Sequence, residues 1–178
     1  MIAVLLLGGC ASEARFLWEE YTRAGVQAVA NKQYGRAEGY LTRAAEKAEA
    51  LGPQEVGRSL NNLGELYRRQ GRSAEAERYF TQALALKESQ LGEEHPDVAT
   101  SLNNLARLYV TQGRDFEAVP LLERSLAIQE KTLDDEHPAL APTLTLLAQA
   151  YRHLGRDADV FEVEVRIHRL REEPSPRR

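Results

Sequence analysis

The run Leu60-Asn61-Asn62-Leu63-Gly64-Glu65-Leu66-Tyr67-Arg68-Arg69-Gln70-Gly71 returns twice in this chain of 178 residues. Its counterparts begin at Leu102 and, with looser identity, at Leu144, so the spacing is 42 residues both times. A constant period of about 20–50 residues is typical of stacked-repeat proteins, in which no single unit can bury its apolar face alone. The sequence therefore predicts an array of similar units.

Within each copy, the apolar residues have the spacing of a helix pair. When Tyr67 and its counterparts are placed at position 11, apolar or small residues occupy positions 4, 7, 8 and 11. These positions share one face of a helix at about 100° per residue. Positions 20, 24 and 27, which are Ala76, Phe80 and Ala83, share one face of a second helix. Small residues at positions 8 and 20 are expected where the two helices approach closely.

The turn between the two helices is repeated as well. Glycine stands where a left-handed residue would end the first helix, and a serine or aspartate two positions later is expected to cap the second helix. These residues are Gly71, Gly113 and Gly155, and then Ser73, Asp115 and Asp157. Residues 161–167 alternate between apolar and charged, as a strand does. Val160, Val163, Ile167 and Leu170 nevertheless share one helical stripe, which predicts a terminal capping helix.

These positions resemble the tetratricopeptide repeat. The segments Glu94-His95-Pro96 and Glu136-His137-Pro138, placed before Asn-Asn-Leu and its looser copy, resemble the kinesin light chain type of this repeat over roughly residues 53 to 157. The resemblance implies an all-α protein, a right-handed α-solenoid of about four helix-turn-helix repeats. We expect a repeat domain over 10–173, with units at about 18–52, 57–94, 99–136 and 141–173, and a disordered tail at 174–178.

The N-terminus is an apolar run that stops at the only cysteine. It is shorter than the roughly 20 residues of a transmembrane helix, but it fits the apolar core of a signal peptide. Leu7-Gly8-Gly9-Cys10 resembles the lipobox of bacterial lipoproteins, which implies a signal peptide at 1–9, cleavage before Cys10 and lipidation of the Cys10 thiol. Ala11 favours the outer membrane of a Gram-negative envelope by the same resemblance. The alternative is a chance apolar start with a buried, inert cysteine.

The aromatic and apolar residues that follow Cys10 have two interpretations. They are expected to cover the open apolar end of the first repeat, and the alternative is contact with a membrane interface, where Trp and Tyr are favoured. These residues are Phe16, Leu17, Trp18 and Tyr21.

Composition and motifs argue against several functions. The net charge of -4 and the lack of a long Lys/Arg run disfavour nucleic acid as a partner. No sequence typical of a zinc protease, a serine hydrolase or a P-loop occurs. His95 and His137 recur at one repeat position, so a role in loops and helix caps is expected rather than metal binding. We therefore predict no enzyme activity, no cofactor and no metal.

The first helix of each unit is expected to line a concave groove that binds an extended peptide or a helix. The predicted groove residues are Arg58, Asn61, Asn62, Glu65, Arg69, Thr100, Asn103, Asn104, Arg107, Thr111, Gln149, Arg152 and His153. Asparagine can both donate to and accept from a peptide backbone, and the kinesin light chain resemblance implies this use for Asn62 and Asn104. The alternative is that these amides bridge adjacent first helices.

The leading hypothesis is a membrane-tethered, non-enzymatic scaffold for a protein or peptide, acidic or extended, because the predicted groove carries several arginines. Contact with the membrane would be through the lipid anchor only, and the scaffold could serve assembly of an envelope complex. A cytosolic regulatory module within a longer protein is the alternative. An enzyme that uses the histidine loops is a third hypothesis.

Overall fold

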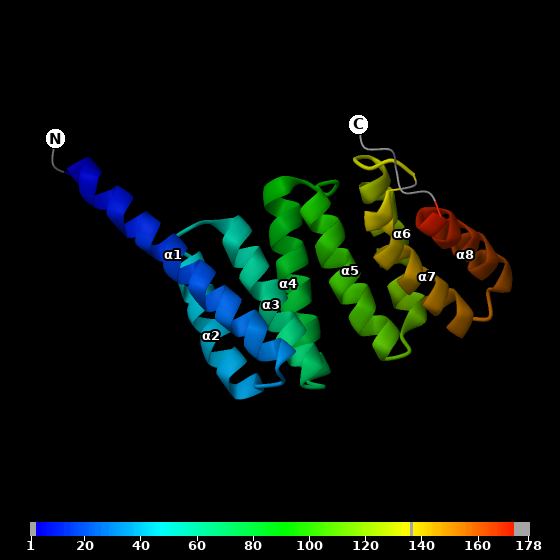
Figure 1. Ribbon diagram of the computed structural model, residues 1–178, viewed down its shortest axis with the longest axis horizontal. Helices are drawn as coiled ribbons and strands as arrows, with labels where there is room; N and C mark the ends of the chain where they lie inside the picture. Colours follow the sequence, from blue (N-terminus) through cyan, green and yellow to red (C-terminus); the bar gives the residue numbers. More distant parts are fainter. Residues whose placement is uncertain (1–2, 136, 173–178) are drawn as a thin grey trace. The chain divides into compact units, whose positions relative to one another are not determined.

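The computed structural model describes the backbone of residues 3–135 and 137–172 and the side chains of residues 11–135 and 137–171. These residues form eight α-helices and one short 3-10 helix, and no strand (Figure 1). The helices are α1 (Ala3–Ala30), α2 (Tyr34–Ala48), α3 (Pro53–Arg69), α4 (Ser73–Leu91), α5 (Pro96–Thr111), α6 (Asp115–Glu130), η1 (Pro138–Leu140), α7 (Ala141–His153) and α8 (Asp157–Glu172). The predicted all-α fold of helix-turn-helix repeats is confirmed.

The chain divides into two compact units, Met1–Gln90 and Leu91–Arg178. The first unit holds the pairs α1/α2 and α3/α4, and the second holds α5/α6 and α7/α8. Figure 1 shows the two helices of each pair side by side and joined by a short turn. Each unit therefore contains two of the predicted repeats.

In the first unit, close approach of the paired helices depends on glycine at position 8. A Cβ atom on Gly64 of α3 would lie 2.5 Å from Cε1 of Phe80 on α4. The Phe80 side chain is fully buried, so the ring fills the space that the missing Cβ leaves. Gly25 on α1 has the same relation to Leu41 on α2, again with a separation of 2.5 Å. The small residues predicted at the helix contacts are therefore required by packing.

The turns after the first helices have one geometry. Gly71, Gly113 and Gly155 have φ angles of 75°, 71° and 69°, which confirms the predicted left-handed residue. Arg72 N–H donates to the carbonyl of Tyr67 at 2.9 Å, and Gly71 N–H donates to the carbonyl of Arg68 at 3.1 Å. These two bonds define a Schellman motif, which satisfies carbonyls that the helix end leaves unpaired.

The predicted caps of the second helices are wrong by one residue. α4, α6 and α8 begin at Ser73, Asp115 and Asp157, so these residues lie inside the first turn. The preceding arginine is the N-cap, because the carbonyl of Arg114, for example, accepts the first helical bond from Ala118 N–H at 3.1 Å. The Schellman turn spans only the glycine and this arginine, which leaves no room for a further cap residue.

Each of these arginines is fixed by the helix before it and the helix after it. The Arg72, Arg114 and Arg156 guanidiniums lie 4.4, 4.0 and 4.3 Å from the ring centroids of Tyr67, Tyr109 and Tyr151. Each also forms an ion pair with an acidic residue three positions later, Glu75, Glu117 or Asp159. This repeated contact joins the two helices of a unit across the turn.

The two histidine loops act as caps. Nδ1 of His95 accepts a hydrogen bond from Asp97 N–H at 3.1 Å and caps α5, and Nδ1 of His137 does the same for Ala139 N–H at the start of η1. The predicted capping role is confirmed. Pro142 lies in the first turn of α7, because η1 takes up the residues before it. Pro120 lies inside α6.

The two ends of the described chain are helical. α8 confirms the predicted terminal helix, and the tail predicted at 174–178 lies outside the described residues. α1 includes the backbone of Cys10, whose side chain is not among those described, and residues 1–2 of the predicted leader also lie outside. Trp18 is buried, packs on Ala44 and Ala48 of α2, and donates from Nε1 to Ser59 Oγ at 3.0 Å. Trp18 therefore lies between the first repeat and α3 of the second rather than over the open end, and Phe16, expected to share that role, is 62% exposed.

Candidate binding faces on the first helices

The two asparagines of α3 have different environments. Asn61 is buried, with 9% of its surface exposed, and Asn62 is half-buried. Successive helical residues point about 100° apart, so one amide turns inward while its neighbour turns to the solvent-facing side. Within residues 11–135 and 137–171, the Asn62 amide has no hydrogen-bonding partner. Of the two predicted groove amides on α3, Asn62 is the one that a ligand can reach.

The corresponding pair on α5 shows what the inward member does. Asn103 Nδ2 donates to Thr143 Oγ1 on α7 at 2.7 Å, and the Thr143 hydroxyl donates to Gln129 Oε1 on α6 at 2.7 Å. Thr143 is fully buried. Asn103 therefore bridges two first helices, which is the structural alternative left open by the sequence.

Asn104 is the outward member on α5. Its Oδ1 atom accepts a hydrogen bond from Arg107 Nη2 at 2.7 Å, and the side chain is half-buried. The acceptor of this amide is therefore engaged, while its two N–H donors have no partner in the described part of the chain. Asn104 can still donate to a ligand carbonyl.

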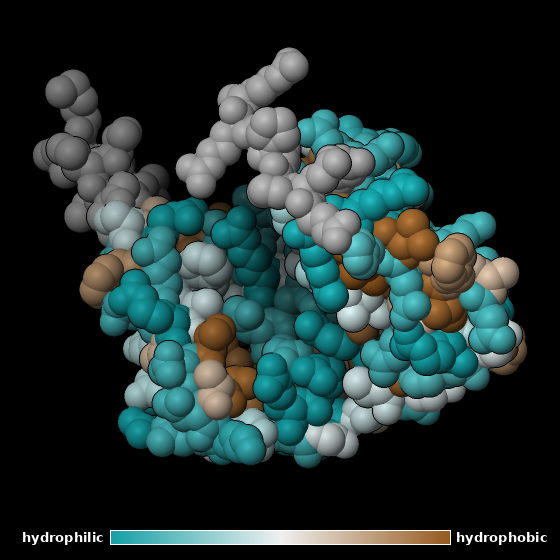
Figure 2. Space-filling model, turned by 45° about the vertical axis from the view of Figure 1, so that its right-hand side comes forward, coloured by the Kyte–Doolittle hydropathy of each residue, from teal (hydrophilic) through white to brown (hydrophobic). Residues whose placement is uncertain are grey.

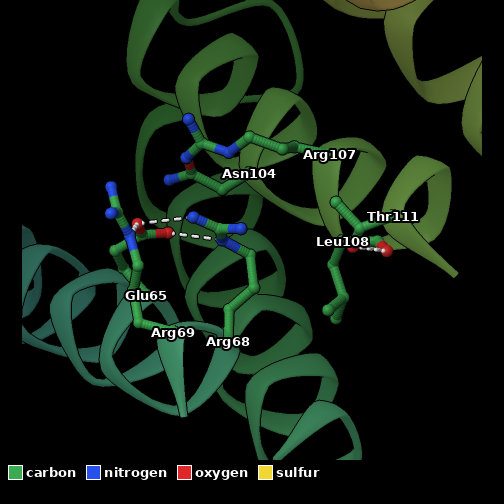
Figure 3. A network of polar contacts seen from close by, with 7 residues as sticks. All are labelled: Glu65, Arg68, Arg69, Asn104, Arg107, Leu108 and Thr111. Carbon is green, nitrogen blue, oxygen red and sulfur yellow. Dashed lines mark hydrogen bonds and ion pairs between the residues drawn. The ribbon is translucent and has the colours of Figure 1, made fainter. Parts of the chain in front are cut away.

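The charged residues of α3 form a cluster with an excess of positive charge (Figure 3). Both carboxylate oxygens of Glu65 accept from Arg68, at 2.7 Å each, and Arg69 Nε donates to the same carboxylate at 2.7 Å. These bonds raise the pKa of Arg68 above its usual range. One carboxylate thus faces two guanidiniums, and Arg58 adds an exposed cation on the same helix. This face of α3 is basic.

The threonines predicted on α5 satisfy their hydroxyl donors within the helix. Thr111 Oγ1 donates to the carbonyl of Leu108 at 2.7 Å, also visible in Figure 3, and Thr100 Oγ1 donates to the carbonyl of Pro96 at 3.4 Å. Both side chains are exposed. They can accept from a ligand, but their contribution to specificity is weaker than that of the asparagines, since the hydroxyl donors are already used.

The three residues predicted on α7 separate in the structure. Arg152 pairs with Glu164 of α8 at 2.5 Å, and His153 Nδ1 lies 3.1 Å from both carboxylate oxygens of Asp115 at the start of α6. Gln149 is exposed and makes no polar contact with the described residues. Among these three, Gln149 is the residue whose whole side chain is without a polar partner in the described part of the chain.

The structure also bears on other kinds of site. No cluster of three or more His, Cys, Asp and Glu side chains suited to a metal ion occurs among the described residues. In the same residues, no helix is both long enough and apolar enough to cross a membrane. Sequence reasoning missed the arginine that stacks on each repeat tyrosine. The signal was present, since each tyrosine is followed five positions later by arginine.

A family model places the chain in a family, solved structures resemble it, and no curated protein matches its sequence. The model of the tetratricopeptide repeat matches residues 21–89, 55–126 and 97–173. A crystal structure of a Podosopora anserina protein, described as a putative kinesin light chain with nearly identical TPR-like repeats, is similar with 28% identity and a TM-score of 0.69, over 90% of this chain and 77% of that one. A single-residue variant of that protein gives 29% identity and a TM-score of 0.70, over 86% of this chain and 74% of that one. The chain belongs to the tetratricopeptide repeat family, whose members typically are non-enzymatic scaffolds that bind protein or peptide partners.

Proposed function

We propose that this protein is a non-enzymatic scaffold that binds a protein or peptide through the outward faces of its first helices. The observation that carries the proposal is the Asn62 amide of α3, which is accessible and has no partner among the described residues. A half-buried amide loses part of its hydration, and a ligand backbone can replace it with both a donor and an acceptor. In the other unit, Asn104 on α5 and Gln149 on α7 offer similar groups.

The charges beside Asn62 define the class of ligand. The cluster of Glu65 with Arg68 and Arg69 has one positive charge in excess, and Arg58 lies on the same helix. Guanidiniums favour carboxylates, to which they donate two parallel hydrogen bonds. The ligand is therefore an acidic segment, or an extended one that places its terminal carboxylate at α3.

We further propose that the protein is lipidated at Cys10 and held at the outer membrane of a bacterial envelope, where it could serve assembly of an envelope complex. The support is the Leu7-Gly8-Gly9-Cys10 sequence and its place directly before the repeats. Metabolic labelling with palmitate tests this. Label is expected on the wild type and not on Cys10→Ser. Equal label on both, or none on either, would contradict it and favour a module of a longer cytosolic protein.

A pair of asparagine variants tests the binding face. Asn62→Ala removes an outward amide, so we expect nearly unchanged thermal stability and weaker capture of partners from a membrane fraction of the source organism. Asn103→Ala is the matched control, since it breaks the hydrogen bond to Thr143 and should lower the free energy of unfolding by about 1–3 kcal/mol. A large loss of stability for Asn62→Ala, or unchanged capture, would contradict the proposal.

A further inference from the structure

α8 has a solvent-facing side that is partly apolar. Ile167 and Leu170 are buried on its other side and pack in the cluster that contains Leu144 of α7. Phe161, in contrast, is 69% exposed, and Val165 one turn later is half-buried. Large apolar side chains that stay in contact with water are a sign of an interaction surface when they are grouped. In Figure 2, hydrophobic surface emerges among hydrophilic surface on the side that is turned forward from the right of Figure 1, where α8 lies.

Phe161 and Val165 form an apolar ridge along α8, and two cavities flank it. One has a volume of about 630 Å³ and lies between α8 and residues Glu130 and Asp135, and the other has a volume of about 400 Å³ and lies on the His168 side. Phe161, Val165 and Arg169 line both cavities. The ridge therefore lies between two hollows. The ridge of a second helix of the same shape can pack into one of these hollows.

Some of the charged side chains around the ridge have ion-pair partners and others do not. Arg166 pairs with Glu130 at 2.5 Å and donates to the carbonyl of Asp135, while Glu164 pairs with Arg152 at 2.5 Å. Glu162 and Arg169, which lie closer to the centre of the face, form no ion pair within residues 11–135 and 137–171. The face thus presents one acidic and one basic group that are both available to a partner.

The positions of these groups follow from helix geometry. With Val165 taken as the centre, Glu162 and Arg169 both lie on one edge of the face, at about 60° and 40° from it. Phe161 and His168 lie on the opposite edge, also within about 60°. Along the axis, Glu162 is about 4.5 Å before Val165 and Arg169 about 6 Å after it. The pattern is therefore nearly symmetric about Val165, with opposite charge at its two ends.

We propose that this face binds the same face of a second copy of the chain, as an antiparallel pair of α8 helices with a two-fold axis at Val165. The two-fold axis places Glu162 beside Arg169 of the second copy, and Arg169 beside Glu162 of the second copy. It also places Phe161 against His168 of the second copy and Val165 against its own counterpart. The contact is isologous, as in most homodimers. It does not depend on the proposed peptide binding.

The charges select the antiparallel arrangement. In a parallel pair the two edges of the face exchange, so Glu162 would lie beside Phe161 of the second copy and Arg169 beside His168, and neither charge would meet an opposite one. The antiparallel pair gives both charges an opposite partner, in two ion pairs. The apolar ridge of each copy then fills a hollow beside the ridge of the other copy.

The test measures the mass of the full chain in solution by sedimentation equilibrium. The chain has a mass of 20.0 kDa, and we expect twice this mass at high concentration. Glu162→Arg and Arg169→Glu should each weaken dimerisation at least about tenfold, because each variant turns two attractive pairs into repulsive ones. An equimolar mixture of the two variants should dimerise again, since each then meets the opposite charge. Glu49→Arg, an exposed residue of the other unit, should behave as wild type.

The outcomes are distinct. If the chain stays monomeric up to about 1 mM, the proposal is overturned. This holds even if another protein is then found to bind α8. A dimer insensitive to both charge reversals, or variants not restored by mixing, would place the contact elsewhere. In a Cys10→Ser background, Val165→Cys should form a disulfide-linked dimer on oxidation and Arg171→Cys should not. Circular dichroism on each variant confirms that α8 remains folded.

Discussion

Replacement of Gly64 by alanine should destabilise the first unit, although alanine is the better helix former. The added Cβ would lie 2.5 Å from Cε1 and 2.6 Å from Cδ1 of Phe80, whose ring is fully buried and cannot move away cheaply. Overpacking of this kind costs about 1–3 kcal/mol, and alanine returns about 0.5–1 kcal/mol through helix propensity. The expected net loss is about 1 kcal/mol or more in the free energy of unfolding.

Gly39 provides the matched control. It lies within α2 in the same unit, and nothing lies within 4 Å of the Cβ that alanine would add. Gly39→Ala should therefore stabilise by about 0.5–1 kcal/mol. Urea titrations followed by circular dichroism measure both values, and a difference of 1 kcal/mol corresponds to a shift of about 2–4 °C in Tm for a chain of this size.

A second substitution tests the assigned contact. Phe80→Leu removes ring atoms that would meet the new methyl group, so Gly64→Ala and Phe80→Leu together should cost less than the sum of the two single changes. Gly39→Ala and Phe80→Leu should instead be additive, because the two sites share no contact. Gly64→Ala that is as stable as Gly39→Ala would refute the close packing of α3 on α4.

Three further predictions follow from local contacts. Lys32 has a φ angle of 58° at the turn position that glycine occupies in the other repeats. Lys32→Gly should therefore raise the free energy of unfolding by about 0.5–1 kcal/mol in the same urea titration. A lower free energy of unfolding would contradict this prediction. His95→Ala removes the cap of α5 and should cost about 1 kcal/mol, whereas His95→Asn should retain most of the stability. Burial, and then the hydrogen bonds to Glu38 and Glu123, raise the pKa of Tyr67 and Tyr151 to about 12. Because these pKa values are raised, the stabilisation is complete below pH 10 and is lost as the pH rises toward 12; titration of the absorbance at about 295 nm should show both late steps, and Tyr67→Phe should remove one.

The helix pairs could be predicted from the sequence because their packing is periodic. Gly64 and Phe80 occupy positions whose spacing places them on facing helices, and Gly71 occupies the turn position that requires a positive φ. The N-caps of the second helices were predicted one residue too late. The turn holds only the glycine and the arginine after it, so the arginine is already the N-cap. Only the path of the backbone shows that the carbonyl of Arg114 begins the next helix.

The partners of long polar side chains could not be predicted in the same way. Periodicity places Arg152 and His153 on the first helix of their repeat, but an extended side chain reaches a neighbouring helix, and the partners Glu164 and Asp115 lie 12 and 38 residues away. The asparagine pairs show the same limit. Asn103 points inward because it bonds Thr143, which lies beside it in space. Thr143 is 40 residues away in sequence, so the sequence pattern does not reveal this contact. Binding by Asn62, Asn104 and Gln149 and lipidation at Cys10 stay predictions.

The claim that the first helices bind the partner is tested most directly by site-specific photo-crosslinking in cells. A benzophenone amino acid at Arg58, an exposed position of α3, or at Gln149 on α7 should give a covalent adduct with a second protein. The same amino acid at Gln82, an exposed position of the second helix α4, is the control and should give none. Adducts only at Gln82, or equal adducts at all three positions, would contradict the account.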